Sequence, residues 1–553
     1  MVLAHLTKCR KGHRRLSIEK SSPKPSLELQ NQRKSSIVLK AVLMSLGTLS
    51  SRFLGLFREV LLAALFDRVV TDAWAAAFKL PNLFRRLLGE GSLSVSFQPI
   101  LIEAEAADRK TGGARAQELS ATLHAFLICL LTVLTLSGIL FADPALHFIL
   151  DADYVTRTEA FQLTVRLAQI MFGFLFFISL FAYYMAILNA HGKFGWPAAA
   201  PLFFNISLII STLLPQTILA TPGDFLAWGV LVGGFLQMAV LVPQLFKFNL
   251  WPGMRWSFNN PDLLRVLKNM VPGLFALGLA QITLIINMGF ASSLGEGVIS
   301  YIAWADRLLE LPLSLISVSL GTALLPALSE HWAQGDKYKM VETSERFVSL
   351  NLFMSAMAAC GLYVLAEPIV RLLFERGRFN YEDSKAVISV VQVYALSMIP
   401  ISLVRVLVPA YFAAKNTWFP ALVSFFGLIL HVILAPQLMK HYGLNGLNYS
   451  SLISASLNFI LLIAFYSFLV HSFEWKRWIK KSIQTLVASA LMVLGMTALL
   501  KQLPSESHAL VWGIQVLVVG GGGIGIYFLS ASLIKHPETD YVVSRFRKKI
   551  LKR

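Results

Sequence analysis

Charged side chains lie within an apolar stretch, residues 51–103, that is long enough to cross a bilayer twice. A charge at the centre of a bilayer costs several kcal/mol, so such side chains usually face a polar cavity or one another. The charged residues at or near membrane depth are Arg52, Arg58, Glu59, Asp72, Lys79, Arg85, Arg86 and Glu90. As a set they predict a charged cavity within the membrane.

The spacing of these residues supports a cavity. Residues seven apart lie on one face of a helix that has about 3.6 residues per turn. Asp72, Lys79, Arg86 and Glu90 follow one another at intervals of seven, seven and four residues, which places them on one stripe. The first arginine and the first glutamate of the set are also seven residues apart.

Charges near helix ends have a simpler explanation, because a long side chain can extend from the apolar region to the membrane surface. This explanation suits Asp67 and Arg68 better than a place in the cavity. We therefore expect these two residues at the surface.

A second charged segment occurs in the apolar run at residues 298–329. Asp306, Arg307 and Glu310 lie within this run, and Pro312 and Pro326 can bend it. The strings SVSFQPILIE, at the end of the first stretch, and SVSLGTALLPALSE, in this run, each lead to a proline and then a glutamate four residues later. Two bent, charged helices six spans apart suggest two halves of six spans, with a site between them as in many transporters.

Arginines outnumber the acids near them in these two segments. Arginine suits the capture of phosphate oxygens, because its planar guanidinium stays charged and donates two parallel hydrogen bonds. A cationic cavity therefore predicts an anionic ligand such as a phosphorylated amphiphile. The alternative is an ion-pair network that is neutral overall, with Asp72, Glu90 and Glu310 as counter-ions, and that only holds bent helices together.

The composition indicates a membrane protein. Of the 553 residues, 56% are hydrophobic and 14% are charged, whereas soluble proteins have about 25% charged residues. Apolar runs of about 20 residues predict helices that span the membrane, and they lack the alternation that a β-barrel needs. Cys9, Cys129 and Cys360 are too far apart to predict a disulfide framework or a metal site.

The fold class that we predict is an all-α polytopic membrane protein with about 14 transmembrane helices. The expected spans are 37–66, 70–103, 117–142, 160–190, 197–219, 223–246, 263–294, 298–329, 343–365, 385–414, 418–438, 444–470, 479–501 and 509–534. Between the spans, the segment 366–384 is expected to form a short amphipathic helix followed by a turn. Loops this short hold no ATPase domain, so we expect no enzyme and no cofactor, and transport that is driven by the membrane potential or an ion gradient.

The basic loops predict the orientation in the membrane. Basic residues follow the even-numbered spans, and residues 1–36 and 535–553 form basic tails. By the positive-inside rule both termini are then cytoplasmic, which requires an even number of spans. The first tail is expected to be disordered.

Several long strings closely resemble the MurJ (MviN) family of lipid II flippases. These strings are SRFLGLFRE, TDAWAAAFKLPNLFRRLLGEGSLSVSFQPIL, AWADRLLELPLSLISVSLGTALLPALS, NMVPGLFALGLAQITLIIN, FERGRFNYEDS and VRVLVPAYFAAKN. The resemblance covers residues from about 37 to 470 and implies the multidrug/oligosaccharidyl-lipid/polysaccharide exporter fold. That fold would have a six-helix lobe at 37–246, a second at 247–470 and two additional helices at 471–534.

The resemblance also implies roles for single residues. Arg52, Arg58 and Arg307 match the family's cavity arginines and would bind the pyrophosphate of the substrate. The other expected substrate-binding residues are Asp72, Arg85 and Arg86. The expected cavity and gate residues are Ser51, Glu59, Lys79, Asn82, Glu90, Asp306 and Glu310.

By the same resemblance, the substrate would be lipid II, a disaccharide-pentapeptide on undecaprenyl pyrophosphate, carried across a bacterial inner membrane by alternating access. Membrane lipids and the cell-wall synthesis machinery are further expected partners, and nucleic acid is not. Two other functions stay open. A cation-coupled drug exporter of the same superfamily would favour an acidic cavity, and a cell-wall scaffold would use the charges only for structure.

Overall fold

The computed structural model describes residues 50–216, 218–257, 259–470, 473–504 and 508–550, apart from 89–91 and 220. These residues form helices and loops, with no strand among them. The protein is therefore an all-α polytopic membrane protein, as predicted. The tail at 1–36, the first part of the 37–66 span and Glu90 lie outside the described residues.

The first group of helices comprises residues 50–247. Residues 50–65 are helical and are followed by α2 (Arg68–Leu88) and α3 (Ser92–Thr111). The rest of the group is α4 (Arg115–Leu140), α5 (Ala142–Ile149), α6 (Ala152–Thr156), α7 (Thr158–Met171), α8 (Gly173–Ala190), α9 (Gly195–Leu213), α10 (Asp224–Ala239) and α11 (Val242–Lys247). The predicted span 70–103 is thus divided into two helices.

The second group of helices comprises residues 298–469. It contains α13 (Val298–Leu313), the π-helix η1 (Ser314–Val318), α14 (Ser319–Ala333), α15 (Lys337–Val364), α16 (Ala366–Phe374), α17 (Tyr381–Ala413), α18 (Trp418–Tyr442) and α19 (Leu444–Leu469). The predicted bend at Pro312 appears as η1, which begins two residues later, whereas α14 continues through Pro326. The predicted amphipathic segment forms α16 and the turn after it.

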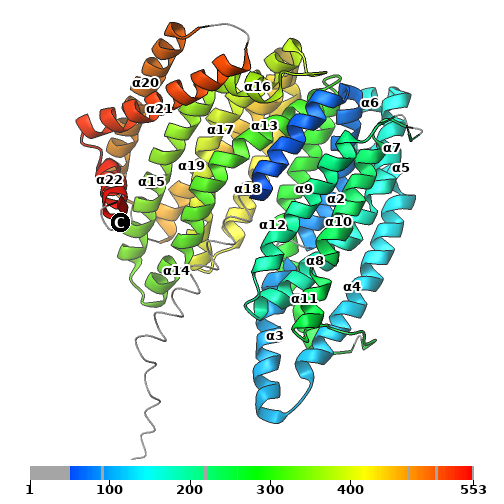
Figure 1. Cartoon of the computed structure of the whole chain (residues 1–553). Coiled ribbons are helices and arrows are strands. Elements are labelled where there is room, and N and C mark those ends of the chain that lie inside the picture. The colour runs from blue at the N-terminus through cyan, green and yellow to red at the C-terminus, as the bar shows by residue number, and fades with distance from the viewer. Residues whose placement is uncertain are drawn as a thin grey trace, which may run out of the picture.

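Three further helices follow the second group: α20 (Trp475–Gln502), α21 (Ala509–Leu533) and α22 (Pro537–Ile550). They lie along the outer edge of that group, against α15 and α16 (Figure 1). Figure 1 shows the two groups close together where α2 and α13 lie, and diverging toward the end that carries α3 and α14.

Ten helical segments among the described residues are long and apolar enough to cross a membrane. The other four predicted spans are 37–66, 70–103, 263–294 and 298–329. The spans 37–66, 70–103 and 298–329 carry charged side chains within the apolar run, and the first of them is only partly described. In 263–294 the charged residues, Arg265 and Lys268, lie near its start. The total of 14 spans stays a prediction.

Helix α12 (Pro261–Ser292) is attached to both groups. Its first turn is held by the first group, because Arg115 donates two hydrogen bonds of 2.6 and 2.7 Å to Asp262. Arg265, one turn later, pairs with Glu103 of α3 at 3.0 Å. Farther along α12, Asn287 contacts His431 of α18 in the second group, while Ser292 in its last turn accepts a hydrogen bond from the backbone N–H of Asp151 in the first group. Movement of one group relative to the other must therefore act on α12.

Asp262 should make the stability of this attachment depend on pH. The hydrogen bonds from Arg115 lower the pKa of the Asp262 carboxyl below its usual value. The carboxylate then stabilises the fold above the pKa of an unfolded aspartate, about 4, and this contribution is lost as the pH falls through the lower, folded pKa. We expect Asp262→Asn to lower the thermal midpoint of the purified protein by a few degrees at pH 7, and to weaken the loss of stability below about pH 4.

A matched control is Glu118→Gln, which removes the partner of Arg255 in an ion pair between two exposed side chains. Exposed pairs contribute roughly 0–1 kcal/mol, so this variant should keep the wild-type midpoint. Equal midpoints and equal acid profiles for Asp262→Asn and wild type would contradict the attachment.

Candidate functional site

A cavity of about 610 Å³ lies between the first group and α13, and its charged lining is almost entirely arginine. It is called the first cavity below. Its lining contains one carboxylate, Glu310, among the described residues. The arginines that line it are Arg52, Arg58, Arg85, Arg86 and Arg307. All five were predicted to face a cavity, because each lies within an apolar run where a charge is costly.

A second cavity, of about 280 Å³, shares part of its wall with the first and is more evenly charged. Asn82, Arg86, Arg307 and Glu310 line both cavities. The further charged residues of the second cavity are Glu59, Lys79, Asp306 and Arg405. Acids and bases are thus nearly equal in number in the described lining of the second cavity, whereas bases dominate the first.

Glu59 lies between Arg58 and Arg307, two of the arginines that are predicted to bind the pyrophosphate. Its carboxylate pairs with Arg58 at 2.5 Å and with Arg307 at 3.6 Å. Arg58 and Glu59 are each only 4% exposed. Arg307 lies on α13 and keeps 44% of its side chain exposed, with a second contact to Glu310 at 3.4 Å. A ligand in the cavity can therefore reach Arg307 more easily than Arg58.

The position of Arg58 is fixed by α9. Its Nη1 donates to Asn205 Oδ1 at 3.2 Å, and its guanidinium lies 5.8 Å from the centre of the Phe204 ring. The amide nitrogen of Asn205 in turn donates to the carbonyl and hydroxyl oxygens of Ser51. The Nε of Arg58 is buried without a hydrogen-bond partner among the described residues. Arg58 thus keeps one buried donor that no described residue satisfies.

Arg52 connects the first cavity to the π-helix of the second group, because its guanidinium donates to the hydroxyl of Ser314. Arg85, on α2, donates to Asn82 Oδ1 at 2.7 Å. The side chain of Arg52 is exposed. Arg52 and Arg307 are therefore arginines of this wall that a ligand can approach directly.

Asp72 lies elsewhere. Its buried carboxylate accepts hydrogen bonds from the backbone N–H groups of Gly297 and Ser300, at 2.5 and 2.8 Å, and from the Ser300 hydroxyl at 2.6 Å. The first N–H groups of a helix have no partner within the helix, and the helix dipole favours an anion there. Asp72 thus joins α2 to the start of α13 and is not among the lining residues of either cavity. Its role in substrate binding stays a prediction.

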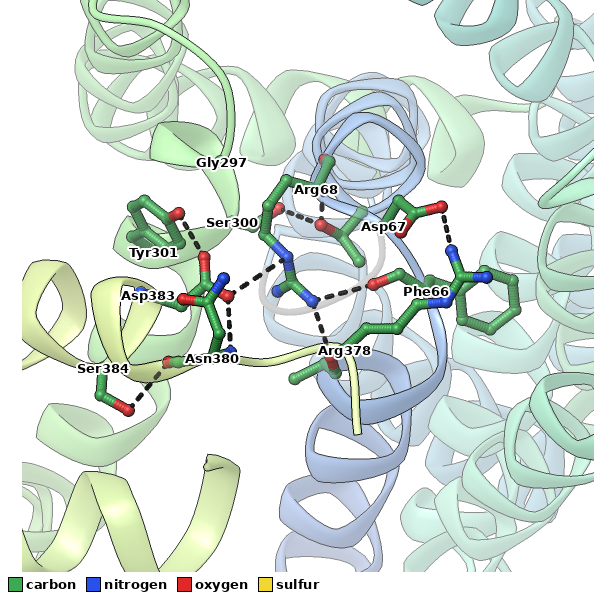
Figure 2. Close-up of polar contacts among 12 residues, drawn as sticks. Phe66, Asp67, Arg68, Gly297, Ser300, Tyr301, Arg378, Asn380, Asp383 and Ser384 are labelled. Carbon is green, nitrogen blue, oxygen red and sulfur yellow. Dashed lines mark hydrogen bonds and ion pairs between the residues drawn. The ribbon is translucent and has the colours of Figure 1, made fainter. Parts of the chain in front are cut away.

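Arg68 corrects an expectation. It is buried rather than at the surface, and it donates to the carbonyl oxygens of Ala63 and Phe66 at 2.7 and 2.8 Å. Its Nε lies 3.9 Å from Asp383 at the start of α17 (Figure 2). Its guanidinium is 4.9 Å from the centre of the Trp304 ring. Arg68 is buried because residues of the second group cover it. The sequence alone places Arg68 near a helix end and therefore predicts that it is exposed.

The turn after α16 completes this contact. The backbone N–H of Arg378 donates to the Ala64 carbonyl at 2.9 Å, and its side chain pairs with Asp67 (Figure 2). Gly377 has a φ of +60°, and a Cβ there would lie 2.2 Å from the Ala64 oxygen, so only glycine fits. We call the contact of residues 63–72 with 297–301 and 376–383 the junction.

The remaining predicted residues are placed as follows. Lys79, Asp306 and Glu310 line the second cavity, Ser51 and Asn82 line the first, and Glu90 lies outside the described residues. Sequence reasoning missed five residues: Asn205, Gln237, Gln281, Ser314 and Arg405. Of these only Arg405 gave a signal, as an arginine in the middle of the predicted span 385–414.

The family model described as lipid II flippase MurJ matches residues 61–517. The chain belongs to the MurJ family. A probable lipid II flippase MurJ of Bdellovibrio bacteriovorus is 45% identical over 470 residues, which are 85% of this chain and 89% of the relative. The lipid II flippase MurJ of Burkholderia cenocepacia is 34% identical over 420 residues, covering 75% and 81%.

Solved structures agree with this assignment. A lipid II flippase MurJ in an inward closed conformation matches with a TM-score of 0.73 and 25% identity, covering 89% of this chain and 98% of that one. A multidrug resistance MATE family transporter in an inward-facing conformation matches with a TM-score of 0.61 and 15% identity, over 78% and 96%. The second match concerns the fold alone.

The junction geometry makes a prediction about Asp72. Asp72→Asn removes the charge that holds the free N–H groups of α13, so the two groups should separate there more often. The reporter is a pair of cysteines in place of Asp67 and Arg378, whose side chains are in contact, in a protein whose native cysteines are serine. We expect the yield of the disulfide crosslink to fall at least twofold in Asp72→Asn.

The control is Glu296→Gln, which changes an exposed acid next to the same helix start. It should leave the crosslink yield unchanged. If Asp72→Asn also leaves it unchanged, Asp72 does not hold the junction closed.

Proposed function

We propose that this protein is a flippase for lipid II, whose pyrophosphate binds in the first cavity. The observation that carries this proposal is the composition of the cavity wall, five arginines and one carboxylate in a protein of the membrane. The names of the relatives support the choice of lipid II over other anionic lipids. A cationic drug would meet net repulsion in this cavity, which disfavours the drug-exporter alternative.

The arginines divide into two roles in this proposal. Arg52 and Arg307 are exposed to the cavity, and their guanidinium groups donate to the oxygens of the pyrophosphate. Arg58 is held by Glu59 and Asn205, and it contributes a fixed positive charge. Arg85 and Arg86 extend the cationic surface along α2. Glu59 and Asn82 orient these side chains.

We propose that the end of the molecule with the α3–α4 loop faces the cytoplasm. The basic residues Arg109, Lys110 and Arg115 in and beside that loop support this orientation. The junction then lies at the outer end of the protein. The substrate enters while the junction is closed and leaves after the two groups separate there, so the hydrogen bonds of Asp72 are broken and remade in each cycle.

Replacing Arg307 tests the cavity directly. Arg307→Ala removes charge-assisted hydrogen bonds, each of which contributes about 1.5–3 kcal/mol, and about 1.4 kcal/mol corresponds to a tenfold change. We expect at least a tenfold loss of lipid II exposure on the outer leaflet when cells depleted of the protein are rescued with this variant. Arg307→Lys keeps the charge but loses the planar guanidinium that donates two parallel hydrogen bonds. Its lipid II exposure should lie between those of Arg307→Ala and wild type.

Arg477→Ala is the matched control, because Arg477 is an exposed arginine on α20, away from both cavities. It should restore wild-type exposure. A scaffold would tolerate Arg307→Ala, so a folded, inserted Arg307→Ala protein with wild-type exposure would contradict the flippase proposal.

The membrane potential should affect the rate of transport. A pyrophosphate with about two negative charges gains roughly 2.3 kcal/mol per charge per 100 mV when it moves outward across an inside-negative membrane. The same field draws the empty, cationic cavity back toward the cytoplasm. We expect flipping in vesicles to slow severalfold when valinomycin and equal potassium concentrations remove the potential. An unchanged rate would exclude coupling to the potential.

A further inference from the structure

His431 is a buried titratable side chain that neither cavity uses. It lies near the middle of α18, with 2% of its surface exposed. Its Nε2 is 2.6 Å from Asn287 Oδ1 on α12, and its Nδ1 is 2.9 Å from the Ser450 hydroxyl on α19. One imidazole ring thus connects three helices, including the helix that is attached to both groups.

The hydrogen bonds around the ring bear on its protonation. The Ser450 hydroxyl has one hydrogen, which it can donate either to the Leu447 carbonyl at 2.7 Å or to Nδ1. In the first case a lone pair of Ser450 faces Nδ1. Asn287 Oδ1 can only accept. A neutral imidazole carries one N–H, and only the protonated ring donates from both nitrogens. When Ser450 donates to Leu447, acceptors lie on both sides of the ring and fit a protonated His431.

The same residues can also satisfy the neutral ring. If the Asn287 amide turns over, its NH₂ group faces Nε2 and donates to it. Loss of the proton then requires only the rotation of this amide or of the Ser450 hydroxyl, and it leaves every ring nitrogen with a partner. His431 can thus gain or lose a proton without an unpaired polar atom in the interior.

The surroundings leave the ring without a counter-ion among the described residues. The titratable groups of α18 itself, Lys440, His441 and Tyr442, lie nine or more residues along the helix. On α12 they are confined to its first eight residues, and α19 contributes tyrosines. On α17, which also packs on α18, they are Tyr381, Glu382, Asp383, Lys385, Tyr394, Arg405 and Tyr411, and none is paired with His431. The protonated state therefore depends on the two acceptors.

A row of polar side chains extends from His431 along the seam between α18 and α19. Ser454 donates to the carbonyl of Gly427, one turn before His431, at 2.5 Å. One turn further along α19, the Asn458 amide donates to Ser424 at 3.2 Å. The Oδ1 of Asn458 is buried without a hydrogen-bond partner among the described residues. This row provides polar groups between the histidine and the start of α18.

We infer that His431 is a proton-binding site that couples transport to a proton gradient, an inference that rests on the proposed flippase function. Reorientation of the first group pulls on α12 through Asp262 and moves Asn287 relative to His431. When Asn287 withdraws, a buried cation loses an acceptor, which is costly, and the proton leaves along the polar row. The proton moves inward as the lipid moves outward.

The test uses the full-length protein in vesicles that contain fluorescent lipid II. Valinomycin and equal potassium concentrations on both sides hold the membrane potential at zero. An imposed gradient of one pH unit, acidic on the outer side, is a tenfold difference in proton concentration. We expect wild type to flip severalfold faster with the gradient than without it. His431→Gln, which keeps a neutral side chain able to hydrogen bond, should flip at the same rate with and without the gradient.

His441→Gln is the matched control, an exposed histidine on the same helix, and it should respond like wild type. A gradient response that persists in His431→Gln, or a wild type that transports lipid II without any response, would overturn the inference while the flippase function stands. If wild type moves no lipid II, the proposed function fails. The site is then tested alone by NMR titration of the His431 ring, where a ring that stays neutral at every pH at which the protein is folded overturns it.

Discussion

A single buried carboxylate, Glu59, makes the cationic cavity compatible with a membrane. Taking an arginine out of water is expensive, and an acid at hydrogen-bond distance offsets much of that cost. Glu59 does this for Arg58 on its own helix and for Arg307 on α13. Arg307 also contacts Glu310, so the excess of positive charge in the first cavity comes from its other arginines, Arg52, Arg85 and Arg86.

The same pair also explains how the cavity wall is built from two groups of helices. Arg58 and Glu59 precede α2, whereas Arg307 comes from the second group, so the cavity is complete only while the groups are close. The junction holds them together at one end through Asp72 and Arg68. At the other end α12 is tied to the first group by Asp262. A protein joined in this way can separate at the junction while α12 keeps the groups connected.

The sequence predicts features that depend only on a residue and its neighbours along the chain. A charge within an apolar run is costly whatever surrounds it, and this argument found every arginine of the first cavity. It failed for Arg68 because burial there comes from the turn after α16, about 310 residues later in the chain. Of the residues that spacing places on one stripe of α2, Lys79 and Arg86 line a cavity. Asp72 instead accepts hydrogen bonds from the first N–H groups of α13. Helical spacing cannot predict that α13 lies beside Asp72. Neutral polar residues such as Asn205 carry little cost in an apolar run, so no feature of the sequence selects them.

The choice of arginine for the cavity has a consequence for coupling. Arginine keeps its charge at any pH that a cell meets, so a wall of arginines binds an anion equally well on both sides of a pH gradient. A gradient can then act only through a side chain that exchanges protons, and that side chain must change its surroundings when the groups move. Glu59 is unsuited because two arginines hold it. His431 meets both conditions, since it is titratable and one of its partners lies on the helix that connects the groups. Separation of the anion site from the proton site would let each be tuned without disturbing the other.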